Sequence, residues 1–272
     1  MLSSLRAEKN KAILRWENRR WESGSEKVLY GIDVPTLALA NGVTLVAAAI
    51  AALTGFGYAL LATPILVMLL PPRIVVPVVL QTSIVLLLLL AYEARVNMDW
   101  KKIGRWVLGA LPGMFLGGYT LWVIEDGQMR SLIGVITLLA AALTWLRPSK
   151  PWKREWPGSL GVGLLSGIMA GASGMSGPPV VLYGLKQNWE HSVLRASLIG
   201  YFGVVHFLTL CVLQGYGMVD RQTLMLGGAI LPGLIVGFAL GMKWRNYVDQ
   251  KVFRYIALGL LCTTGILALL KH

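Results

Sequence analysis

The chain has 272 residues, of which 56% are hydrophobic and only 14% are charged, so it is far more apolar than an average soluble domain. The formal net charge is +12, but the basic residues stand in short clusters between apolar runs, which argues against a nucleic-acid-binding surface. The longest polar stretch is the first 33 residues, which excludes a sizeable soluble domain. The composition therefore predicts an all-α polytopic membrane protein.

Residues 1–33 form a charged amphipathic arm ahead of the apolar part of the chain. The arm lacks the continuous apolar core of a signal peptide, so we expect no cleaved leader. Its aromatic residues Trp16, Trp21 and Tyr30 stand among Lys, Arg and Glu side chains. A solvated or interface-lying helix is the favoured interpretation, and a regulatory or partner-binding arm is the alternative.

Ten apolar runs follow the arm, five in each half of the chain. They cover residues 34–53, 55–70, 73–92, 103–123 and 130–146, and then 159–172, 176–186, 193–214, 223–243 and 253–270. A spanning helix needs about 20 residues, and the runs at 55–70, 159–172 and 176–186 are shorter than that. We expect these three to be half-helices or re-entrant hairpins near the midplane.

The two halves carry similar motifs in the same order. VLQTS at 79–83 matches VLRAS at 193–197, and LPGMFLG at 111–117 matches LPGLIVG at 231–237. Chance does not readily supply several matches in register, so we infer a duplicated five-segment unit. The domains expected after the arm are a first transmembrane repeat at 34–147, a basic cytoplasmic linker at 148–158 and a second transmembrane repeat at 159–272.

Glycine and proline interrupt one apolar stretch in each half. The two stretches are TGFGYALLATPIL at 54–66 and AGASGMSGPPVVLYG at 170–184. An offset of 114 residues pairs Gly57 with Gly171, and Pro64 with Pro178. Within hydrocarbon, a backbone group freed by such a break must be buried in protein or line a watery cavity. The breaks therefore mark the candidate site.

Loop charges predict that the two repeats are inverted. Basic clusters at 95–105, 147–154 and 243–254 should be cytoplasmic, whereas the loops with Glu125 and Asp220 should face outward. Inverted repeats are a common plan of secondary transporters, with the substrate site at the midplane between them. Inversion places the N-terminus outside although the arm is basic, so either its acidic residues offset the signal or a short segment does not cross.

The apolar runs contain no recognisable catalytic machinery. No carboxylate pair, metal-ligand cluster or nucleophile with a base stands at a suitable spacing. We therefore expect no catalytic residue, metal site or cofactor, and we expect that the protein is not an enzyme. Cys211 and Cys262 lie in separate apolar runs and are expected to be core residues. His206 stands alone within its run, and we expect it to be a core residue and not a proton carrier.

The broken segments suit an anionic ligand. A helix that starts inside the membrane directs free N–H groups and its positive dipole end at the cavity, and glycine lets an oxyanion approach the backbone closely. Close helix packing is the other use of small residues, and we favour it for Gly113 with Gly117 and for Gly233 with Gly237.

Arg195 is the candidate anchor for the anion, because a guanidinium presents a planar fork of donors that fits two oxygens. The alternative is that its side chain reaches the cytoplasmic headgroups. The motif alignment places Gln81 at the equivalent position of the first repeat. The candidate substrate-binding residues are Arg195, Gln81, Thr82, Ser83, Ser197, Gly57, Thr63, Ser173, Gly174, Ser176 and Gly177.

GFGYALLATP in the first half, and SGPPVVLYG followed by RASLIGYF in the second, resemble the TauE/SafE sulfite exporter family, also called the toluenesulfonate uptake permease family. The resemblance covers about residues 36–270. It implies a multi-pass transporter of the bacterial plasma (inner) membrane whose partners are the lipid bilayer and a small sulfur oxyanion or organosulfonate, with sulfite and sulfoacetate among the substrates of the family. We expect an exporter. The alternatives are an importer of another small organic anion and a non-transporting scaffold subunit, and assembly as a homo-oligomer is left open.

Overall fold

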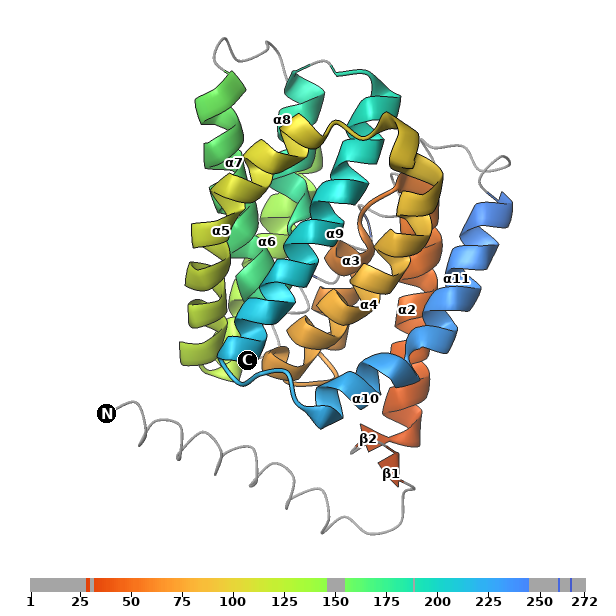
Figure 1. Ribbon diagram of the computed structural model, residues 1–272. Coiled ribbons are helices and arrows are strands. Elements are labelled where there is room, and N and C mark those ends of the chain that lie inside the picture. The colour runs from red at the N-terminus through yellow and green to blue at the C-terminus, as the bar shows by residue number, and fades with distance from the viewer. Residues whose placement is uncertain are drawn as a thin grey trace.

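The computed structural model describes residues 28–29, 32–145, 155–187 and 189–244, together with Gly259 and Gly265. An antiparallel hairpin of two-residue strands, β1 (Val28–Leu29) and β2 (Ile32–Asp33), precedes a bundle of helices (Figure 1). The helices are α2 (Val34–Thr54), α3 (Tyr58–Leu66), α4 (Pro72–Ala94), the 3₁₀ helix η1 (Arg95–Asn97), α5 (Trp100–Val123), α6 (Asp126–Trp145), α7 (Glu155–Ser173), α8 (Gly177–Lys186), α9 (His191–Gly215), α10 (Arg221–Ala229) and α11 (Leu231–Trp244).

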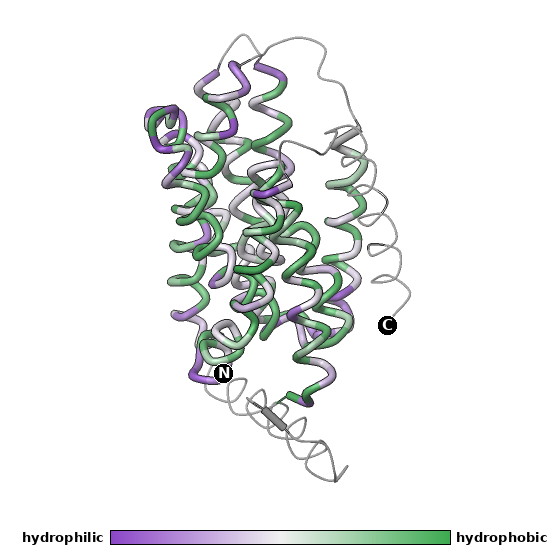
Figure 2. The backbone as a smooth tube through the Cα atoms, turned by 90° about the vertical axis from the view of Figure 1, so that its right-hand side faces the viewer, coloured by the Kyte–Doolittle hydropathy of each residue, from purple (hydrophilic) through white to green (hydrophobic). Residues whose placement is uncertain are grey.

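Several of these helices have the length and composition of membrane spans. Within the described residues, five stretches are long and apolar enough to cross a bilayer, namely Val34–Thr54, Pro72–Asn97, Trp100–Val123, His191–Gly215 and Arg221–Trp244. Figure 2 shows that hydrophobic residues occupy the bodies of the helices and that hydrophilic residues gather mainly near their ends. The expected all-α polytopic membrane class is confirmed.

Figure 1 places the α4–α5 and α8–α9 connections at one end of the bundle, here called the upper end. The α3–α4, α5–α6 and α9–α10 connections lie at the opposite, lower end. Helices α4 and α9 pack against each other in the middle of the bundle. The two short helices α3 and α8 lie beside this central pair.

Helices α3 and α8 have nine and ten residues, so they have the length of the half-helices expected at the two breaks. The run at 159–172 was expected to be short as well, and this expectation is wrong. It forms the inner part of a 19-residue helix, α7, that begins at Glu155. Proline is tolerated in the first turn of a helix, where its missing N–H is not needed, so Pro157 lets α7 start before the apolar run.

The run at 223–243 is not one helix either. It divides at Ile230 into α10 and α11, two residues before Pro232, which has no N–H to donate. Asn41 of α2 bonds backbone groups on both sides of the break: its Nδ2 donates to Ala229 O at 3.2 Å, and Gly233 N donates to its Oδ1 at 3.0 Å. The arm at 1–33, the linker at 148–158 and the run at 253–270 fall mostly outside the described residues.

Glycines bring two pairs of helices into backbone contact. A Cβ added at Gly113 or Gly117 of α5 would overlap the α7 backbone, and one added at Gly233 or Gly237 of α11 would overlap the α2 backbone. The packing role expected for these four glycines is confirmed. The first helix of each half therefore packs against the fourth segment of the other half, as a two-fold relation would require, and the inversion of the repeats stays a prediction.

Helix positions correct the register of the two halves. Helices α3 and α8 begin at residues 58 and 177, and α4 and α9 begin at residues 72 and 191, so both pairs are offset by 119 residues and not by 114. Helix boundaries vary by one or two residues between definitions, which is less than this difference of five. Membrane helices use few residue types, so short motifs can match in a shifted register.

The corrected offset changes the partner of two candidate residues. When the two halves are aligned by their helices, the position equivalent to Arg195 is Val76 and not Gln81. Gly171, which the motifs paired with Gly57, lies inside α7 and packs against α5. The position equivalent to Arg195 is still uncharged, so the charge is present in one half alone.

Candidate substrate cavity

A cavity of about 950 Å³ lies between α4, α9 and the two breaks. Its lining residues Glu93, Asn97, Glu190 and His191 are exposed. They belong to the α4–α5 and α8–α9 connections or the helix turns beside them, so the cavity opens at the upper end of the bundle (Figure 1). We call these four residues the mouth.

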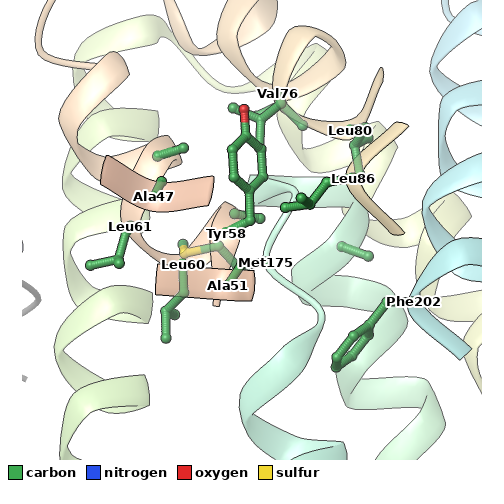
Figure 3. Close-up of a cluster of buried hydrophobic side chains, with 14 of the residues drawn as sticks. Ala47, Ala51, Tyr58, Leu60, Leu61, Val76, Leu80, Leu86, Met175 and Phe202 are labelled. Atoms are coloured by element: carbon green, nitrogen blue, oxygen red, sulfur yellow. The ribbon is translucent and has the colours of Figure 1, made fainter. Parts of the chain in front are cut away.

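Buried apolar side chains enclose the inner part of the cavity. Tyr58, Leu86, Met175 and Phe202 line it from α3, α4, the second break and α9, and each is no more than 4% exposed. Figure 3 shows Tyr58, Leu86 and Met175 gathered in one cluster, with Phe202 nearby. Because these side chains keep water away, a hydrogen bond formed in this part of the cavity is stronger than one formed in water.

The first break turns the chain with two glycines. Gly55 (φ 84°) follows α2 and Gly57 (φ 99°) precedes α3, and positive φ angles strain residues that carry a Cβ. A Cβ at Gly55 would lie 2.7 Å from Arg195 Nε, so the arginine side chain covers this glycine. A Cβ at Gly57 would meet nothing within 4 Å, so the backbone faces open space there.

The start of α3 presents backbone donors to the cavity. The first backbone hydrogen bond of this helix runs from Leu61 N to Gly57 O at 3.1 Å, and no side chain caps the helix. The N–H groups of Tyr58, Ala59 and Leu60 precede that bond, and all three residues line the cavity. Such a helix start favours an anion, because the N–H groups and the positive dipole end point the same way.

The second break has a similar shape and fewer donors. Gly174 has a φ of 73°, and Ser176 precedes α8 without a side-chain capping bond. Pro178 and Pro179 follow Gly177 at the start of α8, and proline has no N–H to donate. The start of α3 is therefore better suited to hold an anion than the start of α8.

Hydrogen bonds hold the second break against its neighbours. Ser166 Oγ of α7 donates to Ser176 O at 2.5 Å, and Tyr201 OH of α9 donates to Ser166 Oγ at 2.8 Å. The Ser176 hydroxyl lies 2.9 Å from His206 Nε2. The His206 ring stacks against Phe202, with the two ring centroids 6.1 Å apart. These contacts fix the positions of Ser176 and His206 in the cavity wall.

The family model for the sulfite exporter TauE/SafE matches residues 40–268 of this chain. The chain belongs to the TauE/SafE family. It is also 23% identical over 199 residues to a protein of Cupriavidus necator named probable sulfite/organosulfonate exporter TauE, and this match covers 70% of the chain and 78% of that protein. No solved structure matches the chain. The resemblance seen in the motifs is confirmed, and the protein is a membrane transporter and not an enzyme.

Five of the residues expected to bind substrate line the cavity of this TauE/SafE transporter. They are Gly57, Ser83, Ser176, Gly177 and Arg195. Arg195 is half-buried and lies about one turn beyond the start of α9. Ser83 is 1% exposed, and its Oγ has no hydrogen-bond partner among the described residues. The cavity thus brings together candidates from both halves of the chain.

Three of the remaining candidates, on α4 and α9, do not line the cavity. Gln81 donates to a backbone carbonyl of α10 at 3.2 Å, and Ser197 Oγ accepts from the backbone N–H that precedes α5 at 3.1 Å. Thr82 Oγ1 lies 2.9 Å from Tyr58 OH. Residues 81–83 are consecutive on a helix, and the rotation of about 100° per residue prevents all three from facing one cavity.

The last three candidates do not line the cavity either. Ser173 Oγ donates to Met169 O at 2.7 Å within α7. Thr63 is fully buried in α3, and a Cβ at Gly174 would lie 3.8 Å from Thr63 Oγ1. The glycines and serines of the breaks therefore marked the right segments, but they did not identify which residues face the cavity.

Four further residues line the cavity that the sequence had not indicated as site residues. They are Tyr58, His206, Glu93 and Glu190. Tyr58 directly follows the first break, so its position was an available signal. His206 follows Arg195 by 11 residues, about three helical turns, which places both on one face of α9. That spacing could have identified His206 from the sequence.

Proposed function

We propose that this TauE/SafE transporter exports a small sulfur-containing anion, sulfite or an organosulfonate, across a bacterial inner membrane. The observation that carries the proposal is a single cavity that contains both Arg195 and the start of α3. A guanidinium and a helix start both favour oxyanions. The relative from Cupriavidus necator is named as a probable exporter of sulfite or organosulfonate, which is the same chemistry.

The side of the membrane on which the cavity opens is inferred from charge. The upper end of the bundle carries the basic cluster at 95–105, and the lower end carries Asp126 and Asp220. Cytoplasmic loops of membrane proteins are enriched in Lys and Arg, so we assign the upper end to the cytoplasm. The cavity opens at this end, so substrate can enter it from the cytoplasm, as export requires.

Arg195 is the proposed first contact of the anion inside the mouth. Its planar fork can donate two hydrogen bonds to two oxygens of a sulfite or sulfonate group. The carboxylates Glu93 and Glu190 line the same cavity and offset part of the positive charge. The site should therefore bind an anion that accepts two hydrogen bonds from Arg195 more tightly than an anion that is attracted by charge alone.

Export of this kind does not require a coupling ion. A membrane potential of 100 mV, negative inside, favours the exit of one negative charge by about 2.3 kcal/mol. The described part of the cavity wall contains Glu93 and Glu190 near the mouth, while its inner part is lined by Tyr58, Ser83 and His206. We therefore propose transport driven by the anion's own electrochemical gradient.

Flux measurements in proteoliposomes test the function. Vesicles loaded with sulfite or sulfoacetate should release it faster when they contain the protein, and the protein with Arg195→Ala should not accelerate release. Where the upper end of the protein faces the outside of the vesicle, an anion supplied outside should be taken up into the vesicle. Folded protein that neither binds nor moves either anion would favour the scaffold alternative, and flux of carboxylates alone would favour a carrier of other organic anions.

A further inference from the structure

Two buried polar groups at the inner end of the cavity have no hydrogen-bond partner among the described residues. They are Ser83 Oγ on α4 and His206 Nδ1 on α9, and their residues are 1% and 5% exposed. Among the lining residues of these two helices, Ser83 and His206 lie farthest from the mouth. Buried polar groups in native proteins almost always have partners, so this pair needs an explanation.

The contacts of His206 indicate which of its ring nitrogens is available. Nε2 lies 2.9 Å from the Ser176 hydroxyl. A neutral imidazole has one donor and one acceptor nitrogen, so when the hydroxyl donates to Nε2, Nδ1 carries the proton. Stacking on Phe202 holds the ring in this orientation. Nδ1–H is then a buried donor on a residue that lines the cavity, and a deprotonated oxyanion can accept from it.

The inner end lies deeper in the cavity than the turn of α9 that carries Arg195. Residues 195 and 206 are 11 positions apart on the same helix, which corresponds to about 16 Å along its axis. Arg195 and His206 therefore line the cavity at different depths along α9.

We infer that the inner end of the cavity is a second oxyanion site, in which His206 Nδ1–H, the Ser83 hydroxyl and the N–H groups at the start of α3 donate to the oxygens of the substrate. This inference rests on the proposed function and extends it. The anion first binds Arg195 near the mouth and then moves along α9 to the inner site. The charged group of the substrate thus separates from the Arg195 guanidinium while it is still inside the protein, before it reaches the far side of the membrane.

Substitutions at His206 separate this role from a structural one. The amide of asparagine occupies roughly the place of histidine Nδ1, and that of glutamine the place of Nε2, because their side chains differ by one methylene. His206→Asn should retain binding of sulfite or sulfoacetate to within a few-fold. His206→Gln keeps a partner for Ser176 but not the Nδ1 donor, and it should weaken binding by roughly tenfold.

Ser83→Ala supplies a second variant on another helix. Removal of a hydroxyl that has no partner in the protein should leave the melting temperature unchanged or raise it, while binding weakens by roughly tenfold. Thr209→Val is the matched control, because Thr209 Oγ1 is also buried without a described partner and Thr209 does not line the cavity. It should not change binding.

The readouts are the melting temperature without ligand and the binding of sulfite and sulfoacetate to purified protein by calorimetry. If His206→Gln and Ser83→Ala both bind these anions like the parent protein, the inner site is wrong and His206 only holds Ser176. If the folded parent protein binds neither anion, the proposed function fails and the inner site fails with it. If Ser83→Ala destabilises the ligand-free protein by as much free energy as it removes from binding, Ser83 is structural.

Discussion

Arg195 joins the two halves of the protein at the cavity wall. It belongs to α9 in the second half, and its side chain covers Gly55 of the first break. A larger residue at position 55 would therefore displace the guanidinium. The contact gives a physical reason for a glycine there beyond its positive φ angle.

Arg195→Ala should abolish transport in a protein that still folds. Hydrogen bonds to charged groups contribute about 1.5–3 kcal/mol, so binding of sulfite or sulfoacetate should weaken by at least roughly tenfold. Arg195→Lys keeps the charge but loses the fork, and weak activity should remain. Arg95→Ala is the control, because Arg95 is exposed, stacks on Tyr92 and does not line the cavity. Parent-like binding by Arg195→Ala would show that this arginine contacts headgroups instead.

Gly57 and Gly174 form a matched pair for testing the approach of the ligand to the backbone. Both have positive φ angles, so Gly→Ala at either position should destabilise the protein by a similar amount, about 1–2 kcal/mol. Only Gly57 lines the cavity. Gly57→Ala should therefore reduce anion binding beyond its effect on the melting temperature, whereas Gly174→Ala should not. Equal binding losses in the two variants would mean that both glycines serve the turn alone.

At the scale of elements, the contact between α5 and α7 depends on glycine. Gly167→Leu would drive a side chain into the backbone of α5 at Ala110, and overpacking of this kind costs about 1–3 kcal/mol or more. Gly161→Leu on the same helix meets nothing within 4 Å and is exposed. The first variant should be lost from the folded fraction in size-exclusion chromatography, and the second should behave like the parent protein. Normal yield of Gly167→Leu would contradict the packing.

The start of α5 should respond to acid. Asp99 precedes this helix, accepts from the N–H groups of Lys101 and Lys102 at 3.1 and 3.2 Å, and pairs with Lys102 Nζ at 2.9 Å. The hydrogen bond from the Lys102 side chain is the main cause that holds the pKa of Asp99 below its usual value. A carboxyl with a lowered pKa stabilises the folded state above its unfolded pKa, about 4, and this contribution is lost as the pH falls through the lower folded pKa. The melting temperature of Asp99→Asn should therefore depend less on pH below about 4 than that of the parent protein, and identical profiles would exclude a role for the carboxylate.

At the scale of the whole molecule, the orientation can be tested by labelling. In a background with Cys211→Ser and Cys262→Ser, a cysteine at Asn97 marks the mouth and a cysteine at Gln128 marks the opposite end, and both positions are exposed. A membrane-impermeant maleimide added to intact cells should label position 128 and not position 97. The reverse pattern would place the mouth outside and favour an importer.

The sequence by itself determined the membrane class, the family and the places where helices break. These features depend on local chemistry: apolar runs of about 20 residues predict spans, and Gly55, Gly57, Gly174 and Pro178 interrupt them wherever the chain packs. The close packing of α5 on α7 at Gly113 and of α11 on α2 at Gly237 was predictable for the same reason, because small residues at helical spacing allow helices to approach each other. The offset of 114 residues given by the break motifs and by VLQTS and VLRAS was wrong by five residues, since motifs in sequences of few residue types match in more than one register.

The tertiary structure decided which residues share the cavity. Ser83 faces it while Gln81 and Thr82 do not, because the rotation of α4 about its axis is set by packing against α3, α9 and α10. His206 changed from an expected core residue to a cavity residue with an available ring nitrogen, since its surroundings come from elements far apart in the sequence. Where a side chain points depends on how neighbouring helices are rotated and cross, and these angles result from packing of the whole molecule, which no single stretch of sequence specifies.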